Sequence, residues 1–439
     1  MRCPCPPRFP EFWQFLRTHG ADPASGRSSM VSSGTPAIVC LAHLGWNNVW
    51  QRPQQILSRI ARHYPVTYVS EPSIDSSPGG EPHLKCVGAE GRGLEPIGET
   101  VTAWQPRFPD RSDVLEGWRE VYVGLVRDLL LRQGWVRQNG AGLAAMRPLI
   151  LWFYTPMPVY FLDHLPADVV VYDVMDELAS FKYAARDLPQ REAQLLARAD
   201  VVFAGGRSLY EARRGRHPQI YQFLSGVDPD HFAQALSPVT EVAAEIAGLA
   251  RPILGYYGVI DERIDLGLLR ALAAQHPDWS IVMVGPVSKI EAGELPRLPN
   301  LHYVGQQPYE RLPNFLKGFD VCLMPFAVND ATRSISPTKT LEYMAASKPI
   351  VSSPIPDVVA NWGDVVQLAA TPVEFAAAIE RVLVESEAAR ASRTARELAI
   401  LAGSTWDHIA AEMRARVEAV LAQRIGGGDW KFELESPTS

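Results

Sequence analysis

Short apolar runs alternate with amphipathic helical patterns along most of the chain. The runs predict strands at residues 37–43, 65–70, 147–154, 168–174 and 199–206 in the first half, and at 251–258, 280–285, 300–305 and 320–326 in the second. Uninterrupted apolar runs bounded by turn residues are typical of strands buried on both faces of a parallel sheet. The alternation of such runs with helices predicts an α/β protein with doubly wound parallel sheets.

A cluster of Gly, Asp and Pro at Ser225–Pro229 interrupts this alternation. It predicts a hinge between two Rossmann-like domains, residues 35–224 and 230–403. Gly226 is the hinge residue expected to adopt a backbone angle that other residues avoid. Two such domains enclose a cleft, and ligands of this fold class bind at the carboxyl ends of the strands and between domains. Within the first domain, residues 112–139 predict one long helix.

The two ends of the chain differ from its body. Residues 1–34 are rich in Pro, Arg and Ser and lack the apolar centre of a signal peptide, so they predict a disordered extension, with Met30 as a sufficient start. The Gly-rich residues 426–439 predict a flexible tail.

Composition narrows the classes of function. The chain has 439 residues, 42 basic and 49 acidic, for a net charge of −7, which gives no support to nucleic-acid binding. Its five cysteines show no paired spacing, so neither a zinc site nor a disulfide framework is indicated. No apolar run reaches the roughly 18 residues that a membrane-spanning helix needs.

Candidate chemistry concentrates in Ser334–Ser353, where the pattern predicts a loop, a short helix and a strand. Ser336 followed by Pro337 predicts a helix with a serine N-cap, and the free N–H groups of a first turn bind anions. Lys339 lies in that turn, where the helix dipole disfavours a cation unless a phosphate is bound. Glu342 lies one turn further on the same face, where it could accept hydrogen bonds from ribose hydroxyls. The alternative is a capped surface helix with a Lys339–Glu342 salt bridge.

This stretch resembles the donor-binding segment of GT-B glycosyltransferases, especially the retaining family four. That segment carries two glutamates and then a small-Met-Ala-small stretch; Glu342 matches the second glutamate, and "YMAASKPIV" matches the stretch after it. Three other segments agree with the family. Residues 255–269 resemble the first strand, loop and helix of the donor domain, and residues 223–232 resemble the hinge. Residues 404–413 resemble the terminal helix that packs back on the first domain. The resemblance covers about residues 36–425.

The resemblance implies that the first domain binds an acceptor, that the second binds the donor, and that the helix at 404–425 crosses back. It implies a set of donor-binding residues: Gly258, Ser334, Ser336, Thr338, Lys339 and Glu342. Lys339 and Arg263 are the implied catalytic cations beside the leaving diphosphate, although Arg263 could instead form a surface salt bridge. Ser225 replaces the asparagine of the family hinge, and two positions of the donor site also depart from the family pattern. Ser334 replaces the first glutamate, which contacts the donor sugar, and Gly258 stands where an arginine is usual.

In the first domain, polar and aromatic residues follow the predicted strands. His43 and Trp46 come after the first strand and are expected to face the cleft, His43 as a catalytic candidate and Trp46 as an acceptor contact. Tyr154 ends a second strand in the same wall. Asp176 and Glu177 follow a third strand and are candidates for binding acceptor hydroxyls. A structural histidine, and acids in the first turn of a helix, are the alternatives for these positions.

These features predict a hexosyltransferase-type enzyme that moves a sugar from a nucleotide-diphosphate sugar to a glycan or glycolipid in cell-surface synthesis. The resemblance implies retention of configuration. No metal is expected, because no Asp-x-Asp pair follows a donor-domain strand, and no cofactor is expected, because the nucleotide sugar is a co-substrate. The expected location is the cytoplasm; peripheral contact with the inner face of the membrane and the oligomeric state stay open. The alternatives are a sugar-nucleotide epimerase of the same fold and a non-catalytic nucleotide-sugar-binding protein.

Overall fold

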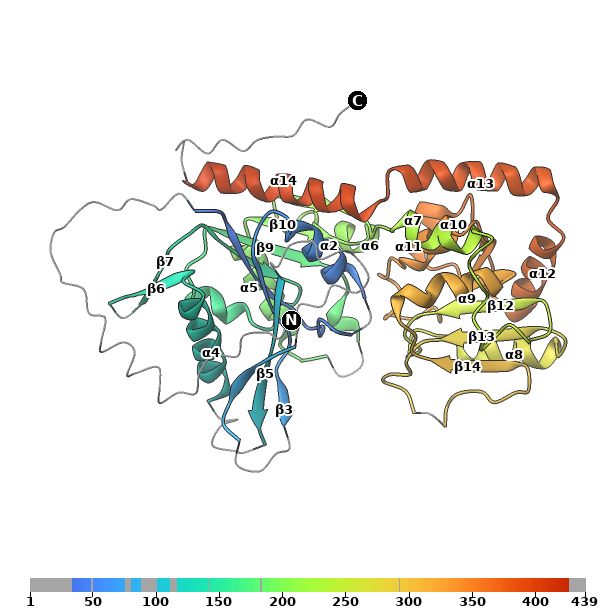
Figure 1. The fold of residues 1–439 in the computed structure, drawn as a ribbon, viewed down its shortest axis with the longest axis horizontal. Helices are drawn as coiled ribbons and strands as arrows, with labels where there is room; N and C mark the ends of the chain where they lie inside the picture. The colour runs from blue at the N-terminus through green and yellow to red at the C-terminus, as the bar shows by residue number, and fades with distance from the viewer. Residues whose placement is uncertain are drawn as a thin grey trace.

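The computed structural model describes residues 34–48, 50–75, 80–87, 101–110, 117–140, 142–181, 184–291 and 293–425. Segments 1–33 and 426–439 lie outside these residues, so the predictions for the two ends of the chain, Met30 included, stay predictions. Figure 1 shows two α/β bodies side by side, with the last helix lying along the first of them. Within the described part of the chain, none of the helices combines the length and the apolar character needed to cross a membrane.

The first domain is built on a nine-stranded sheet in the order β11-β10-β9-β8-β1-β2-β5-β3, with β4 added antiparallel to β5. Its strands are β1 Ala37–Leu41, β2 Val66–Val69, β3 Ser73–Asp75, β4 His83–Cys86, β5 Val101–Pro109, β8 Leu149–Phe153, β9 Val169–Val174, β10 Val201–Ala204 and β11 Ile220–Gln222. Every residue of β1, β2, β8, β9 and β10 is buried. The uninterrupted apolar runs therefore form the centre of a parallel sheet covered on both faces.

The helices of this domain are α2 Arg52–Ile60, α4 Trp118–Arg132, α5 Leu188–Arg198 and α6 Arg207–Arg213, with short 3₁₀ turns η1 Val159–Asp163 and η2 Leu178–Ser180. The long helix predicted for 112–139 is wrong at its carboxyl end. Gly134 adopts a φ of 69° just after α4, a left-handed angle that ends helices. A hairpin follows, formed by β6 Val136–Asn139 and β7 Gly142–Ala145.

The second domain has a six-stranded, wholly parallel sheet in the order β14-β13-β12-β15-β16-β17. Its strands are β12 Ile253–Tyr257, β13 Ser280–Val284, β14 Leu301–Gly305, β15 Val321–Met324, β16 Ile350–Ser352 and β17 Gln367–Leu368. Its helices are α7 Pro229–Ala233, α8 Leu266–Gln275, α9 Leu312–Gly318, α10 Lys339–Ala345, α11 Pro356–Trp362, α12 Pro372–Leu383 and α13 Glu387–Ala402, with 3₁₀ turns η3 Gln234–Leu236 and η4 Tyr309–Arg311. In both sheets the strand order reverses beside the first strand, β1 or β12, which confirms the predicted doubly wound fold.

The last helix, α14 (Trp406–Ile425), crosses back to the first domain, as the resemblance implies. Its apolar side chains, among them Trp406, Met413 and Val417, belong to the same core cluster as residues of β1, β2 and α2. The preceding helix α13 stays on the second domain, where Leu401 joins the core. The chain therefore passes between the domains twice.

The two crossings lie side by side. Val227 and Thr405 form a parallel bridge, and a Cβ on Gly226 would lie 2.9 Å from the backbone nitrogen of Trp406. The prediction of an unusual backbone angle at Gly226 is wrong, since this residue is not among the described glycines of positive φ. Glycine is needed here for close approach of the two crossings.

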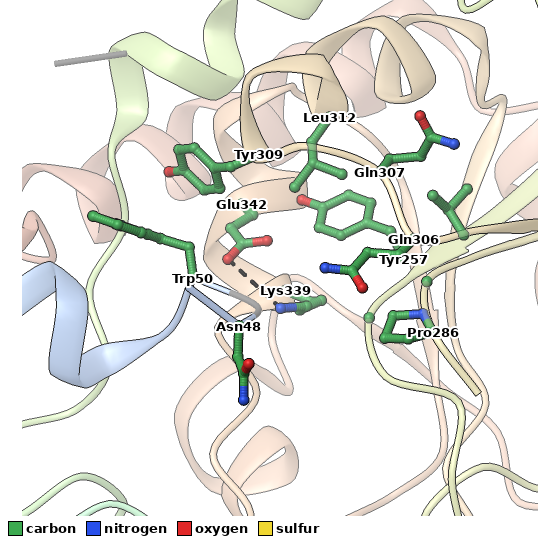
Figure 2. Close-up of a pocket in the computed structure, with 13 residues that line it drawn as sticks. Asn48, Trp50, Tyr257, Pro286, Gln306, Gln307, Tyr309, Leu312, Lys339 and Glu342 are labelled. Carbon is green, nitrogen blue, oxygen red and sulfur yellow. Dashed lines mark ion pairs between the residues drawn. The ribbon is translucent and has the colours of Figure 1, made fainter. Parts of the chain in front are cut away.

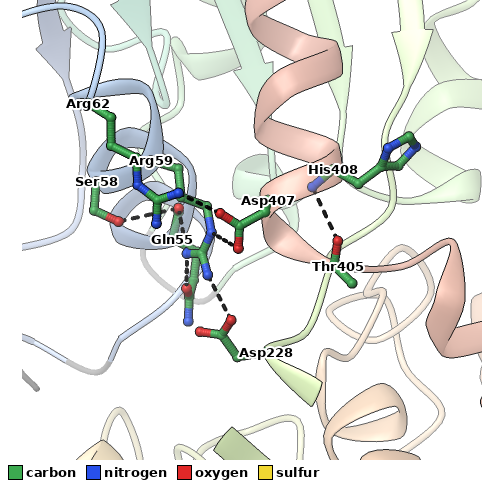
Figure 3. A network of polar contacts seen from close by, with 8 residues as sticks. All are labelled: Gln55, Ser58, Arg59, Arg62, Asp228, Thr405, Asp407 and His408. Atoms are coloured by element: carbon green, nitrogen blue, oxygen red, sulfur yellow. Dashed lines mark hydrogen bonds and ion pairs between the residues drawn. The ribbon is translucent and has the colours of Figure 1, made fainter. Parts of the chain in front are cut away.

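A polar network fixes both crossings to helix α2 (Figure 3). The Arg59 guanidinium donates to Asp228 of the first crossing at 2.8 Å and pairs with Asp407 of the second at 3.1 Å. Arg62 also pairs with Asp407, at 2.7 Å. The Arg59 side chain is only 4% exposed, whereas its partner Asp407 is 52% exposed, so the network joins a buried arginine to the surface where the two crossings meet α2.

Candidate active site

A pocket lies between the two domains, at the carboxyl ends of β12, β13 and β14 (Figure 2). The second domain contributes Tyr257, Gly258, Val284, Gly285, Pro286, Gln306, Gln307, Tyr309, Leu312, Lys339 and Glu342, and the first contributes Asn48 and Trp50. The pocket therefore lies at the carboxyl edge of the second sheet, next to the switch point between β12 and β15, where ligands of doubly wound domains bind.

Lys339 and Glu342 face this pocket together from the first turn of α10 (Figure 2). Their charged groups, Nζ and Oε1, lie 3.9 Å apart, at the outer limit of an ion pair. The other carboxylate oxygen, Oε2, is buried without a hydrogen-bond partner. The predicted salt bridge is present, but it leaves this acceptor atom unused.

Helix α10 begins later than the sequence predicts. Its first residue is Lys339 and its N-cap is Thr338, which already has helical angles of −59° and −28° and makes no side-chain cap. Ser336 is therefore not the N-cap, because the chain is still non-helical at Ser336 and Pro337. The Ser336 hydroxyl is buried without a partner, and the residue lines a second cavity beside the first.

Two glycines allow the backbone to pass close beneath the pocket. Gly258 has a φ of +148°, and a Cβ there would lie 2.6 Å from the Tyr256 hydroxyl. A Cβ on Gly285 would lie 1.9 Å from the carbonyl oxygen of Gly258. A side chain at either position is excluded by backbone geometry and space. The family arginine that Gly258 replaces has no room in this backbone.

The second cavity shares Gly258 and Lys339 with the first and is also lined by Arg263, Ser336, Thr338 and, from the first domain, Arg52 and Asp176. Asp261 holds Arg263 in a forked pair, with Nε–Oδ1 at 2.9 Å and Nη2–Oδ2 at 2.7 Å. Burial disfavours the charged guanidinium, but Asp261 more than offsets this and raises the pKa of Arg263. The salt bridge expected as an alternative for Arg263 is thus present, but it lies in the cleft, where Asp261 orients the guanidinium.

Asp176 reaches this cavity from the opposite domain. Burial raises the pKa of its carboxyl to about 6, against the opposing charges of Arg263 and Lys289. Perturbed carboxyls in clefts are common at functional sites. The structure thus brings Asp176 to the same cavity as the predicted diphosphate-binding residues.

His43 lies outside these two cavities, in a third one in the first domain that Glu71 also lines. Burial lowers the pKa of His43 to about 4, although its hydrogen bond to the backbone of Tyr154 acts the other way. Its Nδ1 is buried without a partner. The imidazole is therefore neutral at pH 7 and keeps one nitrogen unpaired.

Trp46 and Tyr154 were predicted to contact the acceptor, but both side chains are buried. Trp46 is 3% exposed and packs edge-on against Tyr68, with ring centroids 5.0 Å apart, although it also borders the cavity of His43. Tyr154 is 1% exposed and packs beside Trp152. Both belong to the core of the first domain, in the cluster that also contains apolar residues of α2 and α14.

Glu177 and Ser334 are also placed away from the pockets. The Glu177 carboxylate accepts a 2.8 Å hydrogen bond from buried Arg213, which occupies its charge. It precedes the 3₁₀ turn η2 and makes no side-chain cap, so the expected helix start is absent at this position. Ser334 is half-buried but lines neither interdomain cavity.

Sequence reasoning missed much of the pocket wall: Asn48, Trp50, Gln306, Gln307 and Tyr309. A signal for the glutamines was available, since they directly follow a predicted strand and Gly305, whose φ is +80°. Polar residues at the carboxyl end of a parallel strand are candidates for ligand contact. For Trp50, only the approach of the two domains places it at this pocket.

Comparisons with known proteins agree with this architecture. Residues 251–385 match the family model of the Glycosyl transferases group 1. A putative teichuronic acid biosynthesis glycosyltransferase, TuaH of Bacillus subtilis (strain 168), is 25% identical over 254 residues, which span 53% of this chain and 63% of that protein. One similar solved structure is an E. coli trehalose-6-phosphate protein bound with UDP-2-fluoro glucose, with a TM-score of 0.60 and 15% identity over 87% of this chain and 99% of that one. Another is a UDP-forming α,α-trehalose-phosphate synthase of Burkholderia vietnamiensis, with a TM-score of 0.59 and 14% identity over 88% of this chain and 99% of that one.

The predicted GT-B fold is therefore confirmed by the two facing doubly wound domains. The second domain matches the family model of the Glycosyl transferases group 1, and the matched segment spans 63% of the curated glycosyltransferase relative. Among the residues that the structure describes, no group of three or more His, Cys, Asp or Glu side chains is placed to hold a metal ion.

Proposed function

We propose that the protein transfers a sugar from a nucleotide-diphosphate sugar to a glycan or glycolipid acceptor. One observation carries this proposal above the others. Glu342 presents a buried, unpartnered carboxylate oxygen to the interdomain pocket, and Lys339 lies beside it. A ribose supplies two vicinal hydroxyl donors for the carboxylate, and a diphosphate supplies the anion for the lysine.

Stabilisation of the leaving diphosphate is the central chemical task. Negative charge grows on that group as the glycosidic bond to the nucleotide breaks, so fixed cations close to it lower the barrier. Lys339 and the oriented guanidinium of Arg263 supply two such cations in the second cavity. The unpartnered Ser336 hydroxyl is a third donor there. These groups support a reaction without a metal ion.

The acceptor would approach from the first domain. Asp176 stands in the same cavity as Arg263, and with its pKa raised to about 6 it is mostly ionised at pH 7 and can accept a hydrogen bond from an acceptor hydroxyl. Neutral His43, one nitrogen of which is unpaired, is a second candidate contact. The name of the TuaH relative, a putative teichuronic acid biosynthesis glycosyltransferase, supports a polysaccharide acceptor. Retention at the anomeric carbon is supported by the family resemblance alone.

A turnover assay tests this function against its alternatives. UDP-, GDP- and ADP-sugars are first ranked by thermal shift, and the best of them is incubated with the protein, with and without acceptor glycans. A transferase releases nucleotide diphosphate and forms a longer glycan only when acceptor is present. An epimerase changes the sugar nucleotide alone, and a binding protein leaves it intact. Either of these last results would overturn the proposed activity.

A further inference from the structure

The nucleotide pocket is not built by one domain. Trp50, in the loop before α2 of the first domain, lines the same pocket as Glu342 and Lys339 of the second and is drawn beside Glu342 in Figure 2. Beside them, the ring of Tyr309 forms another part of the wall and stacks on His231, with centroids 4.2 Å apart and planes 9° from parallel. The carboxylate that would hold a ribose is therefore flanked by aromatic surfaces from two separate domains.

The position of the Trp50 ring is fixed from within the first domain. Its indole packs edge-on against Trp46, with centroids 5.9 Å apart, and Trp46 packs in turn against Tyr68 at 5.0 Å. The Tyr68 hydroxyl donates to the carbonyl of Leu44 at 2.7 Å, which ties this row of rings to its own loop. Trp50 itself remains half-exposed at the end of the row. A large ring held in this way binds ligands with little loss of side-chain entropy.

We propose that Trp50 contacts the nucleoside of the donor, so that the nucleotide site is complete only while the two domains are together. This inference rests on the proposed function. Sugar and base faces are apolar enough to pack against an indole, while the ribose hydroxyls point to the neighbouring carboxylate of Glu342. Nucleotide affinity is then set partly by the domain that does not carry the diphosphate-binding residues.

A buried contact on the cleft side holds the domains in this arrangement. Asp357 of α11 is 1% exposed, and its carboxylate accepts hydrogen bonds from the backbone nitrogens of Arg207 at 2.8 Å and Ser208 at 3.0 Å, and from the Ser208 hydroxyl. A Cβ on Gly206 would lie 2.8 Å from the same carboxylate and 3.1 Å from Cβ of Ser336. Asp357 thus joins α11 of the second domain to the start of α6 in the first. It is a positioning residue, because it holds the two domains that line the pocket.

The first test measures binding of UDP, GDP and ADP by calorimetry to the full chain and to Trp50→Phe and Trp50→Ala. We expect Trp50→Ala to bind the preferred nucleotide about tenfold more weakly and Trp50→Phe to lose less. Trp118→Ala is the matched control, since Trp118 lies on α4 of the same domain and lines neither interdomain cavity. Wild-type affinity in folded Trp50→Ala would overturn the inference and leave the proposed function standing. Failure of the wild-type protein to bind any of the three nucleotides would overturn both.

The second test asks whether Trp50 acts through the domain arrangement. Asp357→Asn weakens the contact to α6 without touching the pocket, and we expect about threefold weaker nucleotide binding. Asp364→Asn, an exposed acid just beyond the same helix, is the control and should bind as the wild type does. In the Trp50→Ala background, Asp357→Asn should cause no further loss, because coupled sites are not additive. Full additivity of the two losses would show that Trp50 does not depend on the domain arrangement.

Discussion

The two walls of the cleft hold their charged groups in different ways. On the side of the second domain, Lys339 and Glu342 form a loose 3.9 Å pair in which one carboxylate oxygen is unused. On the side of the first domain, charges are closed into buried pairs such as Arg52 with Asp173, at 3.0 Å and with side chains 2% and 0% exposed. A charge with an unused acceptor atom can bind a ligand, whereas a buried and fully paired charge serves the fold. The Lys339–Glu342 pair of the donor wall is therefore open to a ligand, whereas Arg263 on the same wall is held by Asp261 much as Arg52 is held by Asp173 on the acceptor wall.

The largest expected difference between the two walls is in stability. Arg52→Ala should lower the free energy of unfolding by about 3–5 kcal/mol, because Asp173 is left buried without its cation. Urea unfolding of the variant measures this loss. Arg214→Ala removes an exposed pair with Glu211 and should cost about 0–1 kcal/mol. Equal losses in the two variants would contradict the structural role of the buried pair.

A substitution on the donor wall should affect binding and leave stability unchanged. Lys339→Ala is expected to weaken binding of nucleotide diphosphates by about 1.5–3 kcal/mol, the value of a hydrogen bond to a charged group. Calorimetry with UDP, GDP and ADP measures the loss, and the melting temperature should match the wild type. Arg333→Ala, in an exposed pair of the preceding loop, is the control. Unchanged affinity in Lys339→Ala would rule out contact with the diphosphate.

The unused oxygen of Glu342 predicts a finer effect. Glu342→Gln should reduce the preference for ribonucleotides over 2′-deoxyribonucleotides by about 1 kcal/mol, because one acceptor for the ribose hydroxyls is lost. Competition binding of UDP and 2′-deoxy-UDP measures this preference. If both nucleotides lose the same affinity, Glu342 serves only its pair with Lys339.

Asp176 is the exception on the acceptor wall, and its raised pKa predicts a small dependence on pH. The folded protein keeps this proton up to about pH 6, whereas the unfolded chain loses it near the ordinary value of 3.8. Between these values the folded state binds more protons, so stability falls as pH rises. Asp176→Asn should remove this contribution, of about 1 kcal/mol for a partly exposed group. Unfolding curves of both proteins at pH 4, 5, 6 and 7 compare them; parallel pH profiles would contradict the shift.

The sequence predicted the donor wall better than the acceptor wall for a physical reason. Lys339 and Glu342 are three residues apart on one helix, so local geometry alone brings them to one face. Trp46 and Tyr154 belong to a core cluster that includes residues of α14, which starts more than 200 residues further along the chain, so their burial depends on tertiary packing. The start of α10 was missed because Ser-Pro is a strong local signal that the tertiary fold did not use.

The place of Trp50 in the pocket was also not predictable from the sequence. Its chemistry was visible in the sequence, but its partner Glu342 lies in the other domain. No periodicity or spacing joins a loop and a helix so distant along the chain. The overall architecture, in contrast, follows from the repeated apolar runs, because a buried parallel strand needs little more than its own residues and a helix on each face.

The paired crossings have a consequence for how the chain folds during synthesis. Because α14 completes the core of the first domain with Trp406, Ile409 and Met413, that domain consists of two separate stretches of sequence with the second domain inserted between them. The inserted domain has its own core and is synthesised in full before α14 emerges. Domains generally fold as units as they leave the ribosome. The domain that begins first is thus the one that finishes last, and its β1–α2 surface stays uncovered until the final helix is made.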